Sequence, residues 1–207
     1  MTAATLRTRP ARVTDLPEIV SIHRESFPKF FLTFLGPRFL RLFYAQILGN
    51  SQGLCWVAED ENGEQLIGFV AGVTQQAGFY RDMLRRRKWS FAFSAIPALL
   101  RSPAIAFRLL AALRKPADAA EAGAEACLMS IAVRSAEARR GIGSRLVQAF
   151  ADDLKRRGID RFCLTTDRDG NDRVKAFYEK EGFELWRTFV TPQGRWMNEY
   201  LLTLRRG

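Results

Sequence analysis

Apolar positions along the 207-residue chain follow two periods, and the alternation of these periods predicts a mixed α/β fold. Apolar residues at helical spacing predict helices over 13–27, 36–48, 142–157 and 171–182. Short apolar runs bounded by turn residues predict strands over 5–11, 54–60, 65–75, 125–133, 161–166, 184–190 and 195–204. This order indicates a mixed sheet flanked by helices, in which 127–166 forms a parallel, right-handed βαβ unit.

Local signals mark several ends of these elements. Thr14 or Asp15 is expected at the N-cap of the first helix, and Pro37 stands in the first turn of the second. The polar turn over 61–64 joins two predicted strands into a hairpin. Gly158 is the signal that ends the third helix. The boundaries of the main elements can therefore be predicted from single residues.

One long segment, 79–120, interrupts the alternation and is strongly basic. Over 79–115, nine Lys and Arg residues stand against Asp82 alone, so this stretch carries +8 of the formal net charge of +10. Its apolar part is too short to span a bilayer. We expect a helical basic insertion of two or three short helices, interrupted at Pro97 and Pro103.

The charge of this insertion leaves its role open among several alternatives. It could be a helical cover over an acceptor site, with its arginines in water, or a site for an anionic acceptor. Docking to an acidic membrane surface through 85–115 is a further alternative, because aromatic residues flank the basic run. Nucleic acid is not an expected partner, since no recognition module accompanies the charge.

Composition places the chain among ordinary globular proteins. With 207 residues, 47% hydrophobic and 26% charged, it fits a single domain over 1–207. The N-terminus lacks the apolar stretch of a signal peptide, and the three cysteines show no paired spacing, so we expect a cytoplasmic protein with reduced thiols. His23 is the only histidine, which excludes a multi-histidine metal site, and no metal is expected.

A glycine-containing loop, ARRGIGSRL over 138–146, precedes the third predicted helix. It matches neither the dinucleotide fingerprint, whose third glycine would stand at Leu146, nor the P-loop. The amides of 139–144 precede a helix start, and glycines let such a backbone approach an anion closely. These residues alone favour a pyrophosphate cradle and a tight strand-to-helix turn about equally.

This loop, the strand before it and the later segment NDRVKAFYEKEGF together resemble the GCN5-related N-acetyltransferase (GNAT) family. Gly141 and Gly143 fall on the two glycine positions of the family's cofactor loop, while Ala138 stands where Gln or Arg is usual. In the second motif Val174 replaces the usual small residue. The resemblance covers 127–183 and implies the GNAT fold, a mixed, mostly antiparallel sheet of six to seven strands flanked by helices, here with the basic insertion between the third and fourth strands.

The resemblance also implies a cofactor site and a catalytic acid. Acetyl-CoA would be the acyl donor, its pyrophosphate held by the main chain of the loop and its pantetheine arm paired along the preceding strand. Tyr178 would be the general acid for the departing thiolate, although its spacing also fits a core residue. The residues expected to contact the cofactor are Ile131, Val133, Arg139, Arg140, Gly141, Ile142, Gly143, Ser144 and Asn171.

The general base is less clearly marked. The strand 125–133 has no carboxylate at its centre, where many members of the family place a glutamate, and Glu125 at its start is the tentative candidate. Glu25, His23 and Asp167 are alternatives, each of which could act through a chain of water.

The function implied is transfer of an acetyl group from acetyl-CoA to a primary amine of a small-molecule acceptor, such as an amino sugar or another anionic metabolite. Direct attack in a ternary complex is expected, because no cysteine stands in a motif that suggests an acyl-enzyme. Two alternatives are a non-catalytic acyl-CoA sensor and an acetyltransferase of protein or peptide amines with a membrane-docking insertion. The oligomeric state stays open, with a dimer as one alternative.

Overall fold

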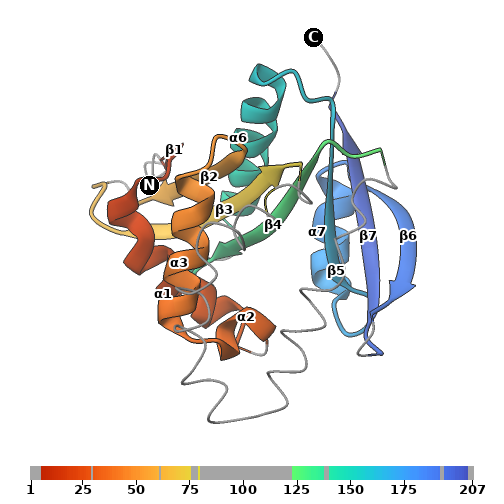
Figure 1. Cartoon of the computed structure of the whole chain (residues 1–207), viewed down its shortest axis with the longest axis horizontal. Coiled ribbons are helices and arrows are strands. Elements are labelled where there is room, and N and C mark those ends of the chain that lie inside the picture. The colour runs from red at the N-terminus through yellow and green to blue at the C-terminus, as the bar shows by residue number, and fades with distance from the viewer. Residues whose placement is uncertain are drawn as a thin grey trace.

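The computed structural model describes residues 6–28, 30–60, 62–75, 79, 123–137, 140–191 and 194–204. Strands and helices alternate along the chain as the sequence predicts (Figure 1). In chain order the longer elements are β1 (Arg7–Pro10), α1 (Leu16–Ser26), α2 (Phe31–Phe34), α3 (Pro37–Leu48), β2 (Gly53–Glu59), β3 (Leu66–Thr74), β4 (Ala126–Val133), α6 (Ile142–Arg156), β5 (Arg161–Asp167), α7 (Asp172–Lys180), β6 (Glu184–Val190) and β7 (Trp196–Thr203).

The described strands form one seven-stranded sheet in the order β1-β2-β3-β4-β5-β7-β6. Every neighbouring pair is antiparallel except β4 and β5, which are parallel and are joined through α6. The predicted mixed, mostly antiparallel sheet and its parallel βαβ unit are therefore confirmed. The hairpin of β2 and β3 is confirmed as well, and β1 lies at one edge of the sheet.

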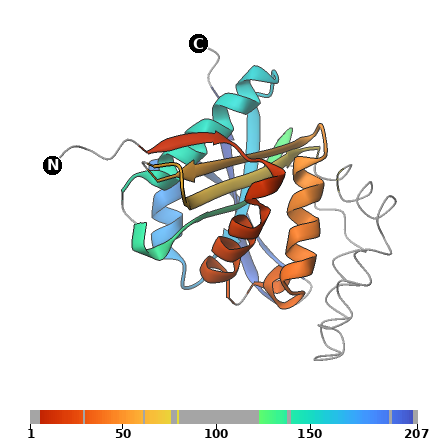
Figure 2. The same ribbon diagram turned by 90° about the vertical axis from the view of Figure 1, so that its left-hand side faces the viewer.

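Two apolar layers hold helices on opposite faces of the sheet (Figures 1 and 2). One core cluster packs α1 and α3 against residues of β2 and β3, with Tyr44 and Phe69 fully buried in it. The other packs α6 and α7 against β4, β5 and β7, around Phe150 and Phe162. Each layer follows from an amphipathic helix whose apolar side faces the sheet.

Three local details differ from the sequence prediction or extend it. Asp15 stands at the N-cap of α1, but its carboxylate accepts hydrogen bonds from the Arg9 guanidinium and the Arg12 amide instead of capping the helix. The short helix α2 was not predicted, because four residues carry too little periodicity to be recognised. Within the predicted insertion 79–120, only Phe79 is described, packed edge-on against Phe43; the predicted helices there lie outside the described residues.

The pairing between the central strands β4 and β5 stops before either strand ends. β4 and β5 pair only from Ala126–Phe162 to Leu128–Leu164, although β4 continues to Val133 and β5 to Asp167. β4 also contains a bulge close to this point. The bulge is seen in the register, where Ala71 pairs with Ser130 but Gly72 pairs with Leu128. The sheet is thus closed at one end of β4 and open at the other.

Candidate functional site

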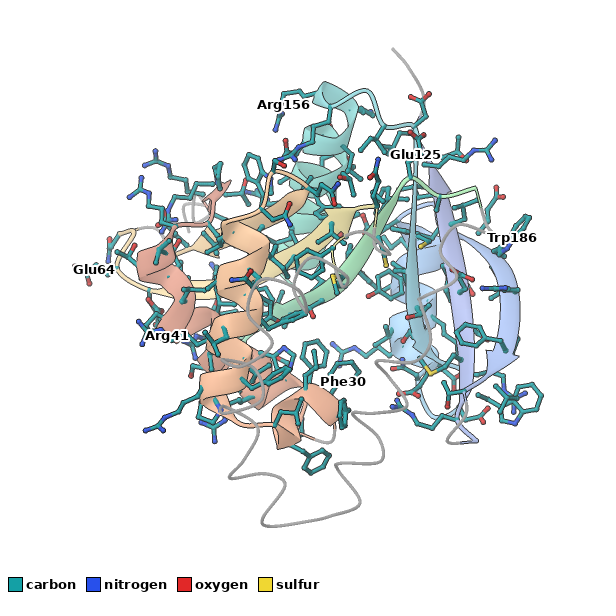
Figure 3. The ribbon with its side chains drawn as sticks, in the orientation of Figure 1. Phe30, Arg41, Glu64, Glu125, Arg156 and Trp186 are labelled. Carbon is teal, nitrogen blue, oxygen red and sulfur yellow. The ribbon has the colours of Figure 1, made fainter. Side chains whose placement is uncertain are left out.

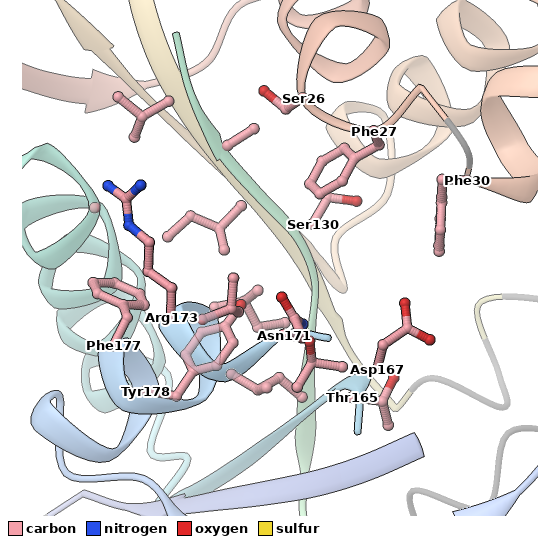
Figure 4. A pocket seen from close by; sticks show the side chains of 18 of the residues that line it. Ser26, Phe27, Phe30, Ser130, Thr165, Asp167, Asn171, Arg173, Phe177 and Tyr178 are labelled. Carbon is pink, nitrogen blue, oxygen red and sulfur yellow. Dashed lines mark hydrogen bonds between the residues drawn. The ribbon is translucent and has the colours of Figure 1, made fainter. Parts of the chain in front are cut away.

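A large cleft occupies the opening between β4 and β5 (Figure 4). Its volume is about 1030 Å³, at the upper limit of the roughly 300–1,000 Å³ usual for small-molecule sites. The walls come from the open part of β4, the end of β5, the first turn of α6, one side of α7 and the end of α1. The cleft therefore joins the glycine loop to the aromatic end of α1 through the middle of the sheet.

The glycine loop turns into α6 at one end of this cleft. Gly141 is the N-cap residue with φ +73°, a left-handed conformation that favours glycine, and a Cβ there would meet nothing within 4 Å. The first hydrogen bond within the helix runs from the Arg145 amide to the Gly141 carbonyl, so the amides of 142–144 precede the helical ladder. These amides and the positive end of the helix dipole suit an anion.

Side chains around the loop contribute less than its backbone. Arg140 forms an ion pair with Glu137 and is half exposed. Arg140 is not one of the described residues that line the cleft. The Ser144 hydroxyl donates to Glu181 at 2.5 Å, so its amide is the group left for a ligand. Arg139, like Ala138, lies outside the described residues.

Several other predicted cofactor contacts do line the cleft. Ile131 and Val133 line it from the open part of β4, and Ile142 and Gly143 line it from α6. Asn171 lines it from the N-cap of α7, where its side-chain amide donates to the Thr166 hydroxyl at 2.5 Å and makes no capping bond. Asn171 therefore stands at the start of α7 and also lines the cleft where a cofactor contact is expected.

Tyr178 reaches the cleft from α7 and is 7% exposed. Its ring packs against Phe177 and Phe183, so it also belongs to the core, as its helical spacing suggests. Burial raises the pKa of Tyr178 well above the ordinary tyrosine value. The phenol therefore stays protonated and can donate a hydrogen bond or a proton into the cleft.

Glu125, the tentative base, is not brought to the cleft. It precedes β4 at the closed end of the sheet, where its carboxylate accepts from the Asp160 amide at 3.5 Å. Figure 3 shows Glu125 near the upper end of the sheet and Phe30 well below it. Glu125 stands five positions before Ser130, roughly 16 Å along a strand at about 3.3 Å per residue, and it is not among the described residues that line the cleft.

The three alternative bases have different surroundings. Asp167 lines the cleft, but both its oxygens accept from Arg195 Nη2, at 2.6 and 2.7 Å. Glu25 accepts from Arg134 and from the Ser135 amide outside the cleft wall. His23 is fully buried behind that wall, and burial lowers its pKa to about 4.

The sequence reading missed three residues of the cleft wall opposite Asp167. Phe27 and Phe30 come from the end of α1 and the turn after it, and Ser130 comes from the bulged part of β4 (Figure 4). Gly72 lies opposite the bulge and was a signal for it, because an interior strand glycine often marks a bulge. A Cβ at Gly72 would lie 2.3 Å from the Cys127 carbonyl oxygen.

The family model of the acetyltransferase (GNAT) family matches residues 16–183. The chain belongs to the GNAT acetyltransferase family. This GNAT protein is therefore an acyltransferase of a family that uses acetyl-CoA as its donor. The expectation drawn from the two sequence motifs is confirmed at the level of the family and fold.

Solved structures share the fold of this GNAT chain at low identity. Ribosomal-protein-S18-alanine N-acetyltransferase from Escherichia coli is 16% identical, with a TM-score of 0.60 over 98% of this chain and 96% of that one. Arabidopsis thaliana NAA60 in complex with acetyl-CoA is 16% identical, with a TM-score of 0.59 over 96% and 98%. An apo agmatine N-acetyltransferase variant is 14% identical, with a TM-score of 0.61 over 96% and 99%.

A search of curated protein sequences found no match for the GNAT chain. Within the described residues, no group of three or more metal-ligating side chains comes together. No helix in the described part of the chain is both long and apolar enough to cross a membrane.

Proposed function

We propose that this protein transfers the acetyl group of acetyl-CoA to a primary amine of a small molecule, by direct attack within a ternary complex. The observation that carries the proposal is the single cleft that runs from the α6 amides to the aromatic end of α1. Two substrates can enter such a cleft from its two ends and meet near Tyr178. Holding both in place lowers the entropic part of the barrier, which is the main contribution expected of this site.

The residues present fit acetyl-CoA as a ligand. The amides of 142–144 and the open glycine conformation suit a pyrophosphate, and the unpaired edge of β4 suits an extended amide-bearing arm. Arg173 and Lys180 line the same cleft from α7 and add positive charge near the anion. Glu137, which lines the cleft, and Glu181, which accepts from Ser144, are carboxylates near the loop that oppose part of this charge.

Acetyl-CoA supplies an activated acetyl group as a thioester when it is bound. The chain's own contribution begins with orientation by the β4 edge, from which a backbone N–H at Ile131 or Val133 can polarise a carbonyl. Tyr178, kept protonated by burial, is placed to donate a proton to a thiolate that leaves. The half-exposed Asp167–Arg195 pair and the two phenylalanines bound the end left for the amine.

The experiment that tests this function measures thiol release from acetyl-CoA with a panel of small primary amines and short peptides. Acetylated product identified by mass spectrometry for a small amine would support the proposal. Preference for peptide amines would favour the protein acetyltransferase alternative. Tight acetyl-CoA binding by calorimetry without turnover on any amine would favour the sensor, and a stable acetylated enzyme would contradict direct attack.

A further inference from the structure

The aromatic end of the cleft is built from two phenylalanine rings that contact each other. Phe27 and Phe30 both line the cleft and are half-buried, and their ring centroids lie 6.0 Å apart with the planes tilted by 49°. Phe27 also packs against the fully buried His23, with 5.0 Å between the ring centroids. The covered part of each ring is therefore held by the α1 layer, and the remaining part faces the cleft.

Hydrogen bonds in the turn between α1 and α2 fix the place of both rings. The Phe27 amide donates to the His23 carbonyl at 2.8 Å, and the Phe30 amide donates to the Phe27 carbonyl at 3.1 Å. The Thr33 hydroxyl donates to the same Phe27 carbonyl at 2.7 Å. Because this turn is already bonded in the absence of a ligand, a ligand that packs on the two rings has little loop entropy to overcome.

Two methionines continue the apolar lining on the sheet side. Met129 on β4 lines the cleft and packs against the same core cluster as Phe27. Met197 on β7 lines the cleft next to Asp167, its partner in the pairing of β5 with β7. Methionine side chains adapt to the shape of a ligand and make favourable sulfur contacts with aromatic rings. The acceptor end of the cleft thus offers an apolar surface from both the helix side and the sheet side.

The charged residues at this end are paired with each other. Across the opening from Phe30 (Figure 4), Asp167 forms an ion pair with Arg195 at 2.6 Å. Asp169, which also lines the cleft, forms one with Arg168 at 2.8 Å. The two pairs together carry no net charge. Within the described residues, the acceptor end therefore offers no unpaired charge to a second ammonium group or to a phosphate.

Given the amine acetylation proposed above, on which this step rests, we propose that the acceptor is a primary amine that carries an aromatic ring and no second charged group. Its ring packs against Phe27 and Phe30, and its amine points along β4 toward the end of the cleft that holds acetyl-CoA. Contact between aromatic rings adds to the gain from burying the apolar surface of the acceptor. Phe30 is then a residue that determines acceptor specificity.

The first test compares matched amines in the thiol-release assay. Phenethylamine, ethylamine, putrescine and glucosamine phosphate each have a primary amine and differ in the ring or in a second charge. kcat/KM for phenethylamine should exceed that for ethylamine by about ten- to a hundredfold, the gain expected from burying one aromatic ring, and should exceed the values for the two charged amines.

The outcomes of this comparison separate the two proposals. A preference for putrescine or for glucosamine phosphate, or equal values for phenethylamine and ethylamine, would overturn the aromatic acceptor alone. Silence of the wild-type protein on every amine would instead contradict the acetyl transfer on which this inference rests.

Phe30→Ala tests the aromatic end in the protein itself. Phe30 is the better position, because Phe27 packs against the buried core and its replacement would disturb the fold. Phe30→Ala should lower kcat/KM for phenethylamine roughly tenfold more than for ethylamine, without changing acetyl-CoA affinity in calorimetry. Phe34→Ala is the matched control, because Phe34 on α2 is 47% exposed and is not one of the described residues that line the cleft. Equal losses for both amines in Phe30→Ala, or the same change of selectivity in Phe34→Ala, would overturn the assignment of Phe30.

Arg195→Gln tests the role of the ion pair. Glutamine keeps a polar side chain but leaves the Asp167 carboxylate without its cationic partner in the cleft. An unpaired carboxylate attracts a second ammonium group, so kcat/KM for putrescine should rise severalfold relative to that for ethylamine. If it does not rise, the pair does not exclude charged acceptors, and that part of the proposal is overturned.

Discussion

Gly143 in the first turn of α6 packs directly against the ring of Phe177 on α7. A Cβ added at Gly143 would lie 3.2 Å from Phe177 Cζ and 3.3 Å from Cε2, closer than a Cβ usually approaches a neighbour. The residue is therefore glycine for space, whereas Gly141 is glycine for its left-handed backbone. The contact ties the two sequence motifs together, because the loop on one helix needs the aromatic residue of the other.

Substituting Gly143 should therefore weaken the protein through this contact. Gly143→Ala should lower the free energy of unfolding by about 1–3 kcal/mol, the usual cost of overpacking. It should also weaken acetyl-CoA binding, because α6 must shift and carry its amides with it. Thermal melting and calorimetry would measure both effects, and Gly143→Glu should impair binding more through its negative charge.

A double variant provides the control for that interpretation. Phe177→Leu shortens the opposing side chain, so Gly143→Ala should cost less in the Phe177→Leu background than in the wild type. Equal costs in the two backgrounds would show that Phe177 does not set the size limit at residue 143.

Gly141 should respond to substitution for a different reason. Nothing lies within 4 Å of its added Cβ, so Gly141→Ala should cost only the left-handed backbone strain, about 1–2 kcal/mol. Gly141→Asn should cost less, since asparagine tolerates this conformation better. Melting temperatures of the two variants would measure the difference, and equal losses would indicate that a direct contact is involved.

Tyr178→Phe should lower turnover with little effect on acetyl-CoA binding. Removing one hydroxyl keeps the ring in its aromatic cluster, so the fold should persist. General acid catalysis contributes about 10²–10⁴-fold, and a loss of at least tenfold in kcat is expected in the thiol-release assay. Glu125→Gln is the matched control, because Glu125 lies at the closed end of the sheet and should leave kcat unchanged. Unchanged turnover in Tyr178→Phe would assign this residue to the core alone.

The stability of the protein should fall between pH 6.5 and about 4 because of His23. The unfolded histidine binds a proton below about pH 6.5, whereas burial lowers the pKa of the folded His23 to about 4. The unfolded state therefore binds more protons in this window, so stability is full above pH 6.5 and declines as the pH falls. The difference amounts to about 3 kcal/mol at most, at about 1.4 kcal/mol per pKa unit.

Urea unfolding across this pH range would measure the slope, and His23→Gln should flatten it. A second loss of stability, caused by Asp15, is expected at lower pH. Burial would raise the pKa of Asp15, but hydrogen bonds from Arg9 and from the Arg12 amide outweigh it and lower that pKa. Its contribution is thus present above the ordinary aspartate value and is lost only below it. An unchanged slope in His23→Gln would contradict the assignment to His23.

Most of the architecture could be predicted from periodicity, because the amphipathic helices and apolar strands each bury a face against the sheet. The helix that begins at Ile142 and the parallel pairing of the two strands of the unit over 127–166 agree with the prediction. The divergence beyond Leu128–Leu164 could not be predicted, because strand propensity says nothing about where two strands stop pairing. That divergence creates the cleft.

The candidate site could be predicted where the chain itself juxtaposes residues. The glycines of the loop lie at the start of α6 because they immediately precede it in sequence. Ser130 was not predicted as a residue of the cleft wall because it lies beside a bulge, and bulges depend on pairing with β3. Glu125 lies away from the cleft because the first residue of a strand lies at the end opposite the loop that follows the strand.

The three-residue pairing of β4 with β5 has a mechanical consequence. The two halves of the sheet are hydrogen-bonded to each other at one end of β4 and β5 only. A ligand that contacts both halves in the cleft should therefore restrict their relative motion and stabilise the fold. Heat and amide exchange would then report occupancy of the cleft without any chemical turnover. An acceptor can accordingly be sought by the extra rigidity it confers on the protein already loaded with an unreactive acetyl-CoA analogue.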